Sequence, residues 1–351
     1  LTDAFTYHNL GAALDFANGL GTVYSWANSN KLIAAFGRIN LNMDDKFFIN
    51  ADLNYEGSSK FGTNNKWGFF YGIGVGVSLD DIMDLGGFDL WVGRQLPPSD
   101  RSNLDGPYYL NAAYSFPMVQ SFGNLGISAG RDDGVAIHGA AADGKFEWAY
   151  GVFEGTSGGS DLDDNVRHTG RIDIALGDPE PGFYTGSTYF GAKKLTTLGL
   201  VFHHEEDGVG SASNQGDFTG VSGDLLIERT LGDGAVVNLE GAYYDWDTDD
   251  KADGTILQGD SFLVLASYLM PNKTSIGGIQ GQFQPYFRYQ GYNRDMTNTS
   301  GSRGYIERAE AGINYVIDGF NAKITALWYV DTDQHNNVDK NTAMLAMQFQ
   351  L

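Results

Sequence analysis

The stretch Gln280–Gln290, "QGQFQPYFRYQ", alternates almost without error between two kinds of side chain. A period of two is typical of a β-strand with two chemically different faces. The side of the strand that faces water decides the fold. In a soluble sandwich the aromatic face is the core, whereas in a membrane barrel it faces lipid and the glutamines line water. One face holds Gly281, Phe283, Pro285, Phe287 and Tyr289, and the other holds Gln280, Gln282, Gln284, Tyr286, Arg288 and Gln290.

The same alternation recurs along the whole chain, and helical periodicity is nearly absent. No run of about 18 consecutive apolar residues exists, so the sequence predicts no transmembrane helix. The pattern therefore favours an all-β protein. Clear examples are Phe47–Tyr55, Lys66–Ser78, Lys145–Phe153, Arg171–Gly177 and Phe320–Val330.

The connections between these strands alternate in length. Short turns at one end and long polar loops at the other are the layout of an outer-membrane barrel, and a soluble sandwich has no reason to sort its loops in this way. Short connections are Asn42–Lys46, Ala142–Lys145, Leu231–Ala235 and Ile317–Phe320, with Gly177–Phe183 slightly longer. Long ones are Glu154–Asn165, Asp247–Thr255 and Asn293–Gly304.

Counting back from the C-terminus gives sixteen strands in one barrel domain over residues 1–351. An even number places both termini on the periplasmic side, as in bacterial outer-membrane barrels. The strands begin near residues 7, 32, 46, 66, 87, 134, 145, 167, 195, 217, 235, 257, 279, 304, 320 and 342.

Composition narrows the classes of partner and site. The formal net charge of −22 argues against nucleic acid as a partner, because nucleic-acid binding needs a basic patch. The absence of cysteine argues against a disulfide framework or a zinc-thiolate site. No signal peptide is visible at the start, "LTDAFTYHNLG", so we expect a processed or trimmed chain. We expect no cofactor and no resident metal.

One connection is unusually long. Between the strand Phe88–Gln95 and the strand that begins near Gly134 lie roughly 38 residues, about 96–133, with no clear strand. This third long loop is rich in Tyr, Phe and Pro, so we expect it to pack against a surface. Inside a barrel the available surface is the wall of the lumen.

Three motifs in this region resemble a known family. Trp91–Ser99 (WVGRQLPPS), Gly130–Gly139 (GRDDGVAIHG) and Phe146–Gly155 (FEWAYGVFEG) occur in the order found in the phosphate-selective porins O and P of Gram-negative bacteria. The resemblance implies a sixteen-stranded outer-membrane β-barrel, a homotrimer, and a third extracellular loop folded into the lumen.

Two features depart from that family. Phosphate selectivity there rests on a ladder of lumen arginines and a few lysines, whereas this chain has 22 basic residues against 44 acidic ones. The chain also ends in Leu351 rather than an aromatic residue. The family name therefore does not predict phosphate as the solute, and the acidic excess predicts weak cation preference or little preference.

The leading interpretation is a porin, a water-filled channel for passive diffusion of small hydrophilic solutes or ions, in contact with outer-membrane lipid and lipopolysaccharide. A non-porin barrel, such as a sheath around a partner protein or an outer-membrane enzyme, and a soluble two-domain β protein remain the alternatives. The sequence shows no catalytic constellation: there is no cysteine, no Gly-x-Ser-x-Gly elbow and no Walker loop. We therefore predict that the protein is not an enzyme.

Charged residues on the inward faces and on loop three are the candidate pore-lining and constriction residues. Opposed basic and acidic groups would set a transverse field and an ion preference. The alternative is that they only form pairs on a wet wall, each contributing about 0–1 kcal/mol, or anchor the base of the loop. The candidates are Arg38, Asp52, Asp89, Asp100, Arg101, Asp105, Arg131, Arg171, Asp173, Arg288, Arg308, Glu310 and Lys323.

Two motifs raise the question of a metal. In "HHEED", adjacent strand residues point to opposite faces, so His203 and His204 cannot readily share an ion. Asp245–Gly254 has the aspartate spacing of an EF-hand start without its turn glycine and closing glutamate. We interpret His203 and His204 as part of a solvated strand end, and for Asp245–Gly254 a contact with a divalent cation in an outer loop stays open.

Pro285 cannot donate a ladder hydrogen bond, so we predict a bulge, a missing rung or a compensating inward neighbour there.

Overall fold

The computed structural model describes residues 32–44, 46–58, 67–78, 88–105, 109–112, 130–156, 160–180, 182–251, 258–294, 304–334 and 338–350. These residues form β-strands and one short helix, α2 (Arg101–Leu104). The strands are β1 (Leu32–Met43), β2 (Phe47–Ser58), β3 (Trp67–Ser78), β4 (Phe88–Gln95), β5 (Asp132–Ala141), β6 (Phe146–Phe153), β7 (Arg167–Ala175), β8 (Thr196–Ser211), β9 (Asn214–Thr230), β10 (Val236–Asp247), β11 (Gly259–Leu269), β12 (Lys273–Ile276), β13 (Ile279–Arg294), β14 (Gly304–Asp318), β15 (Ala322–Asp333) and β16 (Val338–Phe349).

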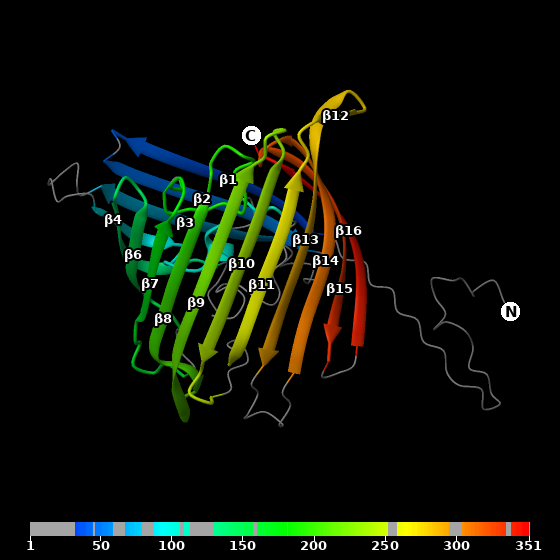
Figure 1. Cartoon of the computed structure of the whole chain (residues 1–351). Helices are drawn as coiled ribbons and strands as arrows, with labels where there is room; N and C mark the ends of the chain where they lie inside the picture. The colour runs from blue at the N-terminus through cyan, green and yellow to red at the C-terminus, as the bar shows by residue number, and fades with distance from the viewer. Residues whose placement is uncertain are drawn as a thin grey trace, which may run out of the picture. The chain divides into compact units, whose positions relative to one another are not determined.

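The sixteen strands form one sheet in which neighbours along the chain are neighbours in space. Every register from β3 to β16 is antiparallel, and β12 lies off the main path, paired with β13. Figure 1 shows β7 to β11 side by side in this order. From residue 32 onward the strands agree with those predicted, except that β12 was not predicted. The largest difference is at β16, predicted from residue 342 and observed from Val338. The strand predicted near residue 7 lies outside the described residues.

The chain divides into two compact units. The first comprises residues 1–40 and 50–73, and the second comprises residues 41–49 and 74–351. In the first unit, Arg38 and Asp52 form an ion pair of 2.5 Å, and the rings of Tyr55 and Trp67 stack at 4.9 Å. The second unit holds β4 to β16 and all the sites discussed below. That the chain forms a single domain stays a prediction.

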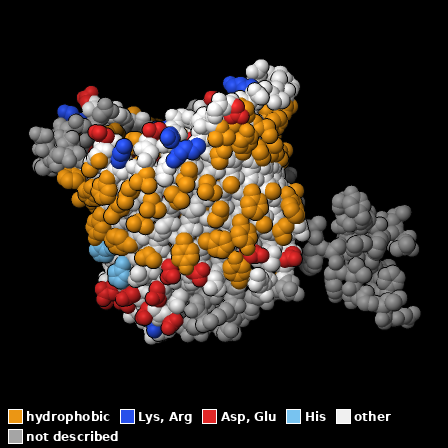
Figure 2. Space-filling model, viewed as in Figure 1, with side chains coloured by type: hydrophobic (Ala, Val, Ile, Leu, Met, Phe, Trp, Pro, Cys, Tyr) orange, Lys and Arg blue, Asp and Glu red, His pale blue; other side chains and the backbone are white. Residues whose placement is uncertain are grey.

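Burial alternates along the strands of the second unit, as their sequences predict. On β8, Val201, His203 and Glu205 are buried, whereas Leu200 and Phe202, which alternate with them, are exposed. Exposed hydrophobic side chains beside buried polar ones reverse the arrangement of a soluble protein. Figure 2 shows the exposed hydrophobic residues as a belt across the strands, with charged residues above and below it. Among the described residues, no helix has the length and hydropathy of a membrane span.

The stretch from Gln280 to Gln290 lies on β13, and its aromatic face is the outer one. Gln284, Arg288 and Gln290 are buried on the inner face, and Phe287 is 52% exposed. The register between β13 and β14 runs straight through Pro285, which pairs with Ile313. On the other side, the register with β11 ends at Ser267 and Tyr286, immediately before the proline. The predicted missing rung is therefore found on the β11 side.

Candidate functional site

The described part of the third long loop packs against the inner face of the sheet. Residues 96–105 are buried throughout, although most of them are polar. The carboxylate of Asp100 accepts hydrogen bonds from the Ser102 hydroxyl at 2.6 Å and from the Tyr244 hydroxyl of β10 at 2.9 Å. The loop, which runs from residue 96 to 131 between β4 and β5, is therefore held on the wall by hydrogen bonds as well as by contact.

Charged side chains of alternating sign connect this loop to the wall. The Arg171 guanidinium of β7 bonds to Asp224 of β9 at 2.6 Å and to Asp173 at 2.5 Å. It also donates to the Ser99 carbonyl at 3.0 Å. Asp224 in turn accepts a hydrogen bond from the Arg101 backbone N–H at 3.2 Å. Loop three thus rests on a buried network in which each arginine contacts two carboxylates.

A second segment reaches the same place from the other end of the sheet. The connection between β7 and β8, residues 176–195, emerges at the end opposite loop three because the strands are antiparallel. Its Glu180 accepts two hydrogen bonds from the Arg101 guanidinium, at 2.9 and 2.6 Å. The Thr185 hydroxyl donates to Asp105 at 2.5 Å, and the Ser187 N–H donates to the Tyr109 carbonyl at 2.9 Å.

Two glutamates of the wall hold this second segment. Glu228 of β9 accepts hydrogen bonds from the Thr188 hydroxyl at 2.6 Å and from the Gly191 N–H at 2.8 Å. Glu240 of β10 accepts one from the Ser187 hydroxyl at 2.6 Å. The sequence pattern predicts only a slightly longer turn at 177–183 and does not predict this inward fold. The sequence did hold a signal for this fold, because the connection is about twenty residues long although it lies on the side of the short turns.

The far end of the described loop is also anchored. Lys323 of β15 donates a hydrogen bond to the Leu110 carbonyl at 2.5 Å. The Asn111 side-chain amide donates to the Ser267 hydroxyl of β11 at 2.8 Å. Lys323, predicted as a lining residue, therefore contacts the loop.

Burial and charge shift the pKa values of the groups on the two inward segments. Burial opposes the ionisation of Glu180, but Arg101 outweighs it and lowers the pKa of that carboxyl. Burial, reinforced by the charge of Glu240, raises the pKa of Asp105 well above its usual value. Burial likewise raises the pKa of Tyr189, whose hydroxyl donates to Glu180 at 2.7 Å. Opposite shifts on neighbouring carboxyls show that Arg101 favours charge on Glu180 and that Asp105 is the more easily protonated group.

The remaining predicted residues lie elsewhere. Arg288 and Glu310 form a fully buried pair of 2.6 Å on β13 and β14. Arg308 bonds to Asp331 at 2.5 Å and lies 3.8 Å above the Tyr329 ring. The structure thus brings Asp100, Arg101, Asp105, Arg171 and Asp173 to the region where loop three meets the wall, with Asp224 paired to both arginines, and places Arg288, Arg308 and Glu310 in separate pairs. Arg131 is half-buried at the end of loop three, and Arg38 and Asp52 lie in the first unit.

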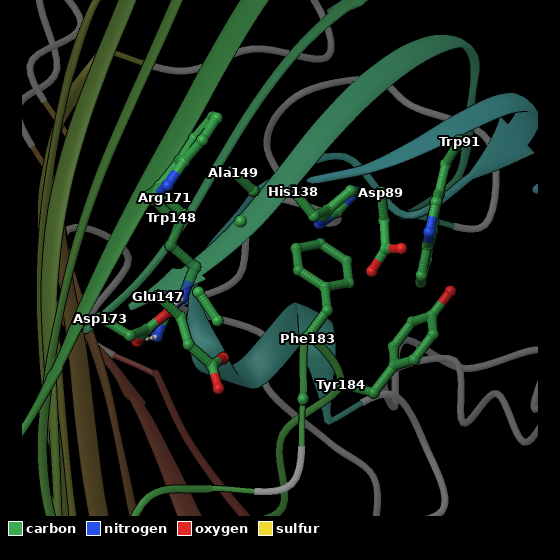
Figure 3. A pocket seen from close by; sticks show the side chains of 13 residues that line it. Asp89, Trp91, His138, Glu147, Trp148, Ala149, Arg171, Asp173, Phe183 and Tyr184 are labelled. Atoms are coloured by element: carbon green, nitrogen blue, oxygen red, sulfur yellow. Dashed lines mark hydrogen bonds and ion pairs between the residues drawn. The ribbon is translucent and has the colours of Figure 1, made fainter. Parts of the chain in front are cut away.

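A cavity of about 330 Å³ lies between β4–β7 and the second segment. Asp89, Glu147, Arg171 and Asp173 line it together with the rings of Trp91, His138, Trp148, Phe183 and Tyr184. Figure 3 shows Phe183 between Glu147 on one side and Asp89 and Trp91 on the other, with Tyr184 near Trp91. The charged residues Asp89, Arg171 and Asp173 were predicted as pore-lining residues, whereas the aromatic ones were not.

The described residues contain no group of three side chains suited to hold a metal ion. His203 is buried on the inner face, whereas His204 on the outer face contacts the Thr219 hydroxyl at 3.1 Å. The two histidines therefore do point apart, as their adjacency predicts. Part of Asp245–Gly254, the second candidate motif, lies outside the described residues.

Comparison with known proteins supports the fold. No family model matches the chain, and no curated protein sequence matches it. OprB of Pseudomonas putida is 11% identical, over 91% of this chain and 87% of that chain, with a TM-score of 0.56. The anion-selective porin of Comamonas acidovorans is 12% identical, over 89% of this chain and 84% of that chain, with a TM-score of 0.49. At such identity the likeness to OprB concerns the fold alone, and the chain has the fold of the outer-membrane porins, an antiparallel transmembrane β-barrel.

Proposed function

We propose that the protein is an outer-membrane porin through which small hydrophilic solutes or ions diffuse passively. The observation that carries this proposal is the reversed burial of the sheet. Charged side chains such as Arg171, Asp224 and Glu240 are buried on the inner face, and large hydrophobic side chains are exposed on the outer face. An apolar outer band and a polar interior are what a barrel in lipid requires.

Loop three and the lumen charges form the constriction in this proposal. Arg101 on the loop pairs with Asp224 on the wall, and Arg171 of the wall pairs with the same carboxylate, so opposite charges meet where the loop rests on the wall. Such an arrangement of charges orients solutes and sets ion preference. Membership in the phosphate-selective O and P family, a homotrimeric state and contact with lipopolysaccharide belong to the same proposal and rest on the three motifs.

Single-channel recording in planar bilayers tests the proposal. We expect ohmic steps from the purified, folded protein, and none from a heat-denatured sample of the same preparation. Folded protein without conductance steps would favour a barrel with another task. A protein that extracts without detergent and behaves as a compact soluble monomer would contradict the location in the membrane.

Ion preference is a separate measurement. The acidic excess and the three carboxylates that line the cavity against one guanidinium support weak cation preference. The reversal potential under a KCl gradient gives the sign. Strong anion preference would show that the inward arginines outweigh the acids, and competition with phosphate would then test the family's substrate.

A further inference from the structure

One side chain of the cavity lacks the partners that its chemistry requires. His138 of β5 is only 7% exposed, and neither of its ring nitrogens has a hydrogen-bond partner. A neutral imidazole offers one donor and one acceptor, and leaving such groups buried and unpaired is unfavourable. His138 lines the cavity, so a molecule inside the cavity is in a position to satisfy it.

Aromatic rings surround this histidine. The Phe183 ring meets it edge-on with centroids 4.3 Å apart, and the Trp91 ring lies 4.5 Å away. The Tyr184 ring is 5.7 Å from that of Trp91. Figure 3 shows these rings on one side of the cavity, contributed by β4, β5 and the second inward segment. The rings offer apolar contact and π faces that attract cations.

The charges of the cavity are mainly negative. Asp89, Glu147 and Asp173 line it, with Arg171 as the basic residue among the described lining. The Arg171 guanidinium already bonds to both Asp173 and Asp224, so its charge is matched by those two carboxylates. Among the described residues, no nitrogen of a basic side chain lies within 4 Å of the Glu147 carboxylate. An anionic guest would therefore meet unfavourable charge.

We propose that this cavity is a binding site for a primary organic ammonium ion with an apolar body. The carboxylates of Asp89 and Glu147 neutralise the ammonium group, and His138 accepts one of its hydrogen bonds. The rings of Trp91, Phe183 and Tyr184 contact the apolar body. A primary ammonium group carries three N–H donors and can serve His138 together with the carboxylates, whereas a quaternary ammonium ion has none.

The site deepens the proposed function and rests on it, because solutes would reach the cavity through the barrel. Binding can nevertheless be measured without any conductance. Isothermal titration calorimetry on the folded protein in detergent would compare 2-phenylethylammonium with its neutral counterpart 2-phenylethanol and its anionic counterpart phenylacetate. We expect the ammonium ion to bind about tenfold more tightly than the alcohol, and the anion to bind more weakly than the alcohol.

Two variants and a matched control locate the binding. Glu147→Gln should weaken ammonium binding about fivefold to tenfold and leave the binding of 2-phenylethanol unchanged, whereas His138→Phe removes an acceptor that serves both molecules and should weaken the binding of both. Asp143→Asn removes one carboxylate from the exposed turn between β5 and β6, at the same end of the sheet, and should change neither affinity. A shift in gel mobility on heating, as for the wild-type protein, shows that a variant is folded. If a variant does not fold, Asp89→Asn is used in its place.

Equal binding of the ammonium ion and the alcohol would overturn the proposal, and so would preference for phenylacetate or an equal effect of Asp143→Asn. Ammonium binding in a protein that does not conduct would support the site and contradict the porin. Conductance without ammonium binding would support the porin and contradict the site.

Discussion

Arg101 and Glu180 are joined by two hydrogen bonds of 2.9 and 2.6 Å, although their segments enter from opposite ends of the sheet. Both side chains are buried, at 1% and 5% exposure. Breaking a buried ion pair by removal of one partner typically costs 3–5 kcal/mol, because the other charge remains buried and unmatched. This pair therefore couples loop three to the second inward segment.

Replacing one partner should separate the two segments. Arg101→Met is expected to lower the free energy of unfolding by about 3–5 kcal/mol and to increase proteolysis within 176–195. The exposed pair of Arg94 and Asp133, at 42% and 48% exposure, provides the control, and Arg94→Met should cost about 0–1 kcal/mol. Urea unfolding in detergent measures both. Equal effects of the two variants would show that the inward pair does not hold the segments.

The opposite pKa shifts of Glu180 and Asp105 predict opposite dependences of stability on pH. The lowered pKa of Glu180 gives stability that is present above its unfolded pKa and is lost as pH falls through the folded value. The raised pKa of Asp105 means that stability falls as pH rises from the unfolded value, about 3.9, through the folded one.

Asparagine and glutamine substitutions separate these contributions. Asp105→Asn should remove the loss of stability on the alkaline side, because an amide still accepts the hydrogen bond from Thr185 and carries no buried charge. Glu180→Gln should instead lower stability above the unfolded pKa of the glutamate, since Arg101 loses its main partner. Thermal midpoints between pH 3 and 8, a range that extends below the unfolded pKa of both carboxyls, test both signs. A fall in stability at neutral pH in Asp105→Asn would contradict the assignment.

The sheet could be predicted from the sequence because its signal is local. Alternation along β13 or β8 assigns each side chain to a face without knowledge of any neighbour. This is why the inward positions of Arg171, Arg288 and Lys323 were found by parity alone. The long loop was equally visible, because its composition differs from that of the other connections.

The second inward segment and the cavity could not be predicted in the same way. Glu180 acquires its role from Arg101, 79 positions away in the chain, and Ser187 from Glu240, 53 positions away. In the sequence, His138 resembles any polar residue of an alternating strand. Only the structure shows that the Phe183 ring packs against it. These contacts depend on how two connections fold inward, and neither connection has a repeating pattern of polar and apolar residues that predicts its fold.

The absence of native cysteine allows the solute path to be mapped by single substitutions. Tyr184 lines the cavity and is 44% exposed, whereas Leu200 on the outer face of β8 is 50% exposed. If ions pass the cavity, a charged methanethiosulfonate reagent should reduce the conductance of Tyr184→Cys and leave that of Leu200→Cys unchanged. Unaltered conductance after confirmed labelling of Tyr184→Cys would place the ion path away from the cavity.

A glycine on β14 gives a test of the wall itself. Gly312 faces Tyr286 across the β13–β14 register, and a methyl group on Gly312 would overlap the Tyr286 ring. That ring cannot move freely, because its hydroxyl donates a hydrogen bond to Glu310 at 2.7 Å, and Glu310 also pairs with Arg288. The glycine therefore leaves space that the buried Tyr286 fills.

Gly312→Ala should destabilise the barrel by about 1–3 kcal/mol, because the displaced ring strains or breaks the hydrogen bond to Glu310. Gly241→Ala on β10 is the matched control: its nearest contact is the Leu263 carbonyl at 3.7 Å, an ordinary van der Waals distance. Urea midpoints of the two variants should therefore differ, with Gly241→Ala close to the wild-type protein. If Tyr286→Phe removed the difference between the two alanine variants, the hydrogen bond would be the source of the penalty; if the difference persisted, steric overlap with the ring would be.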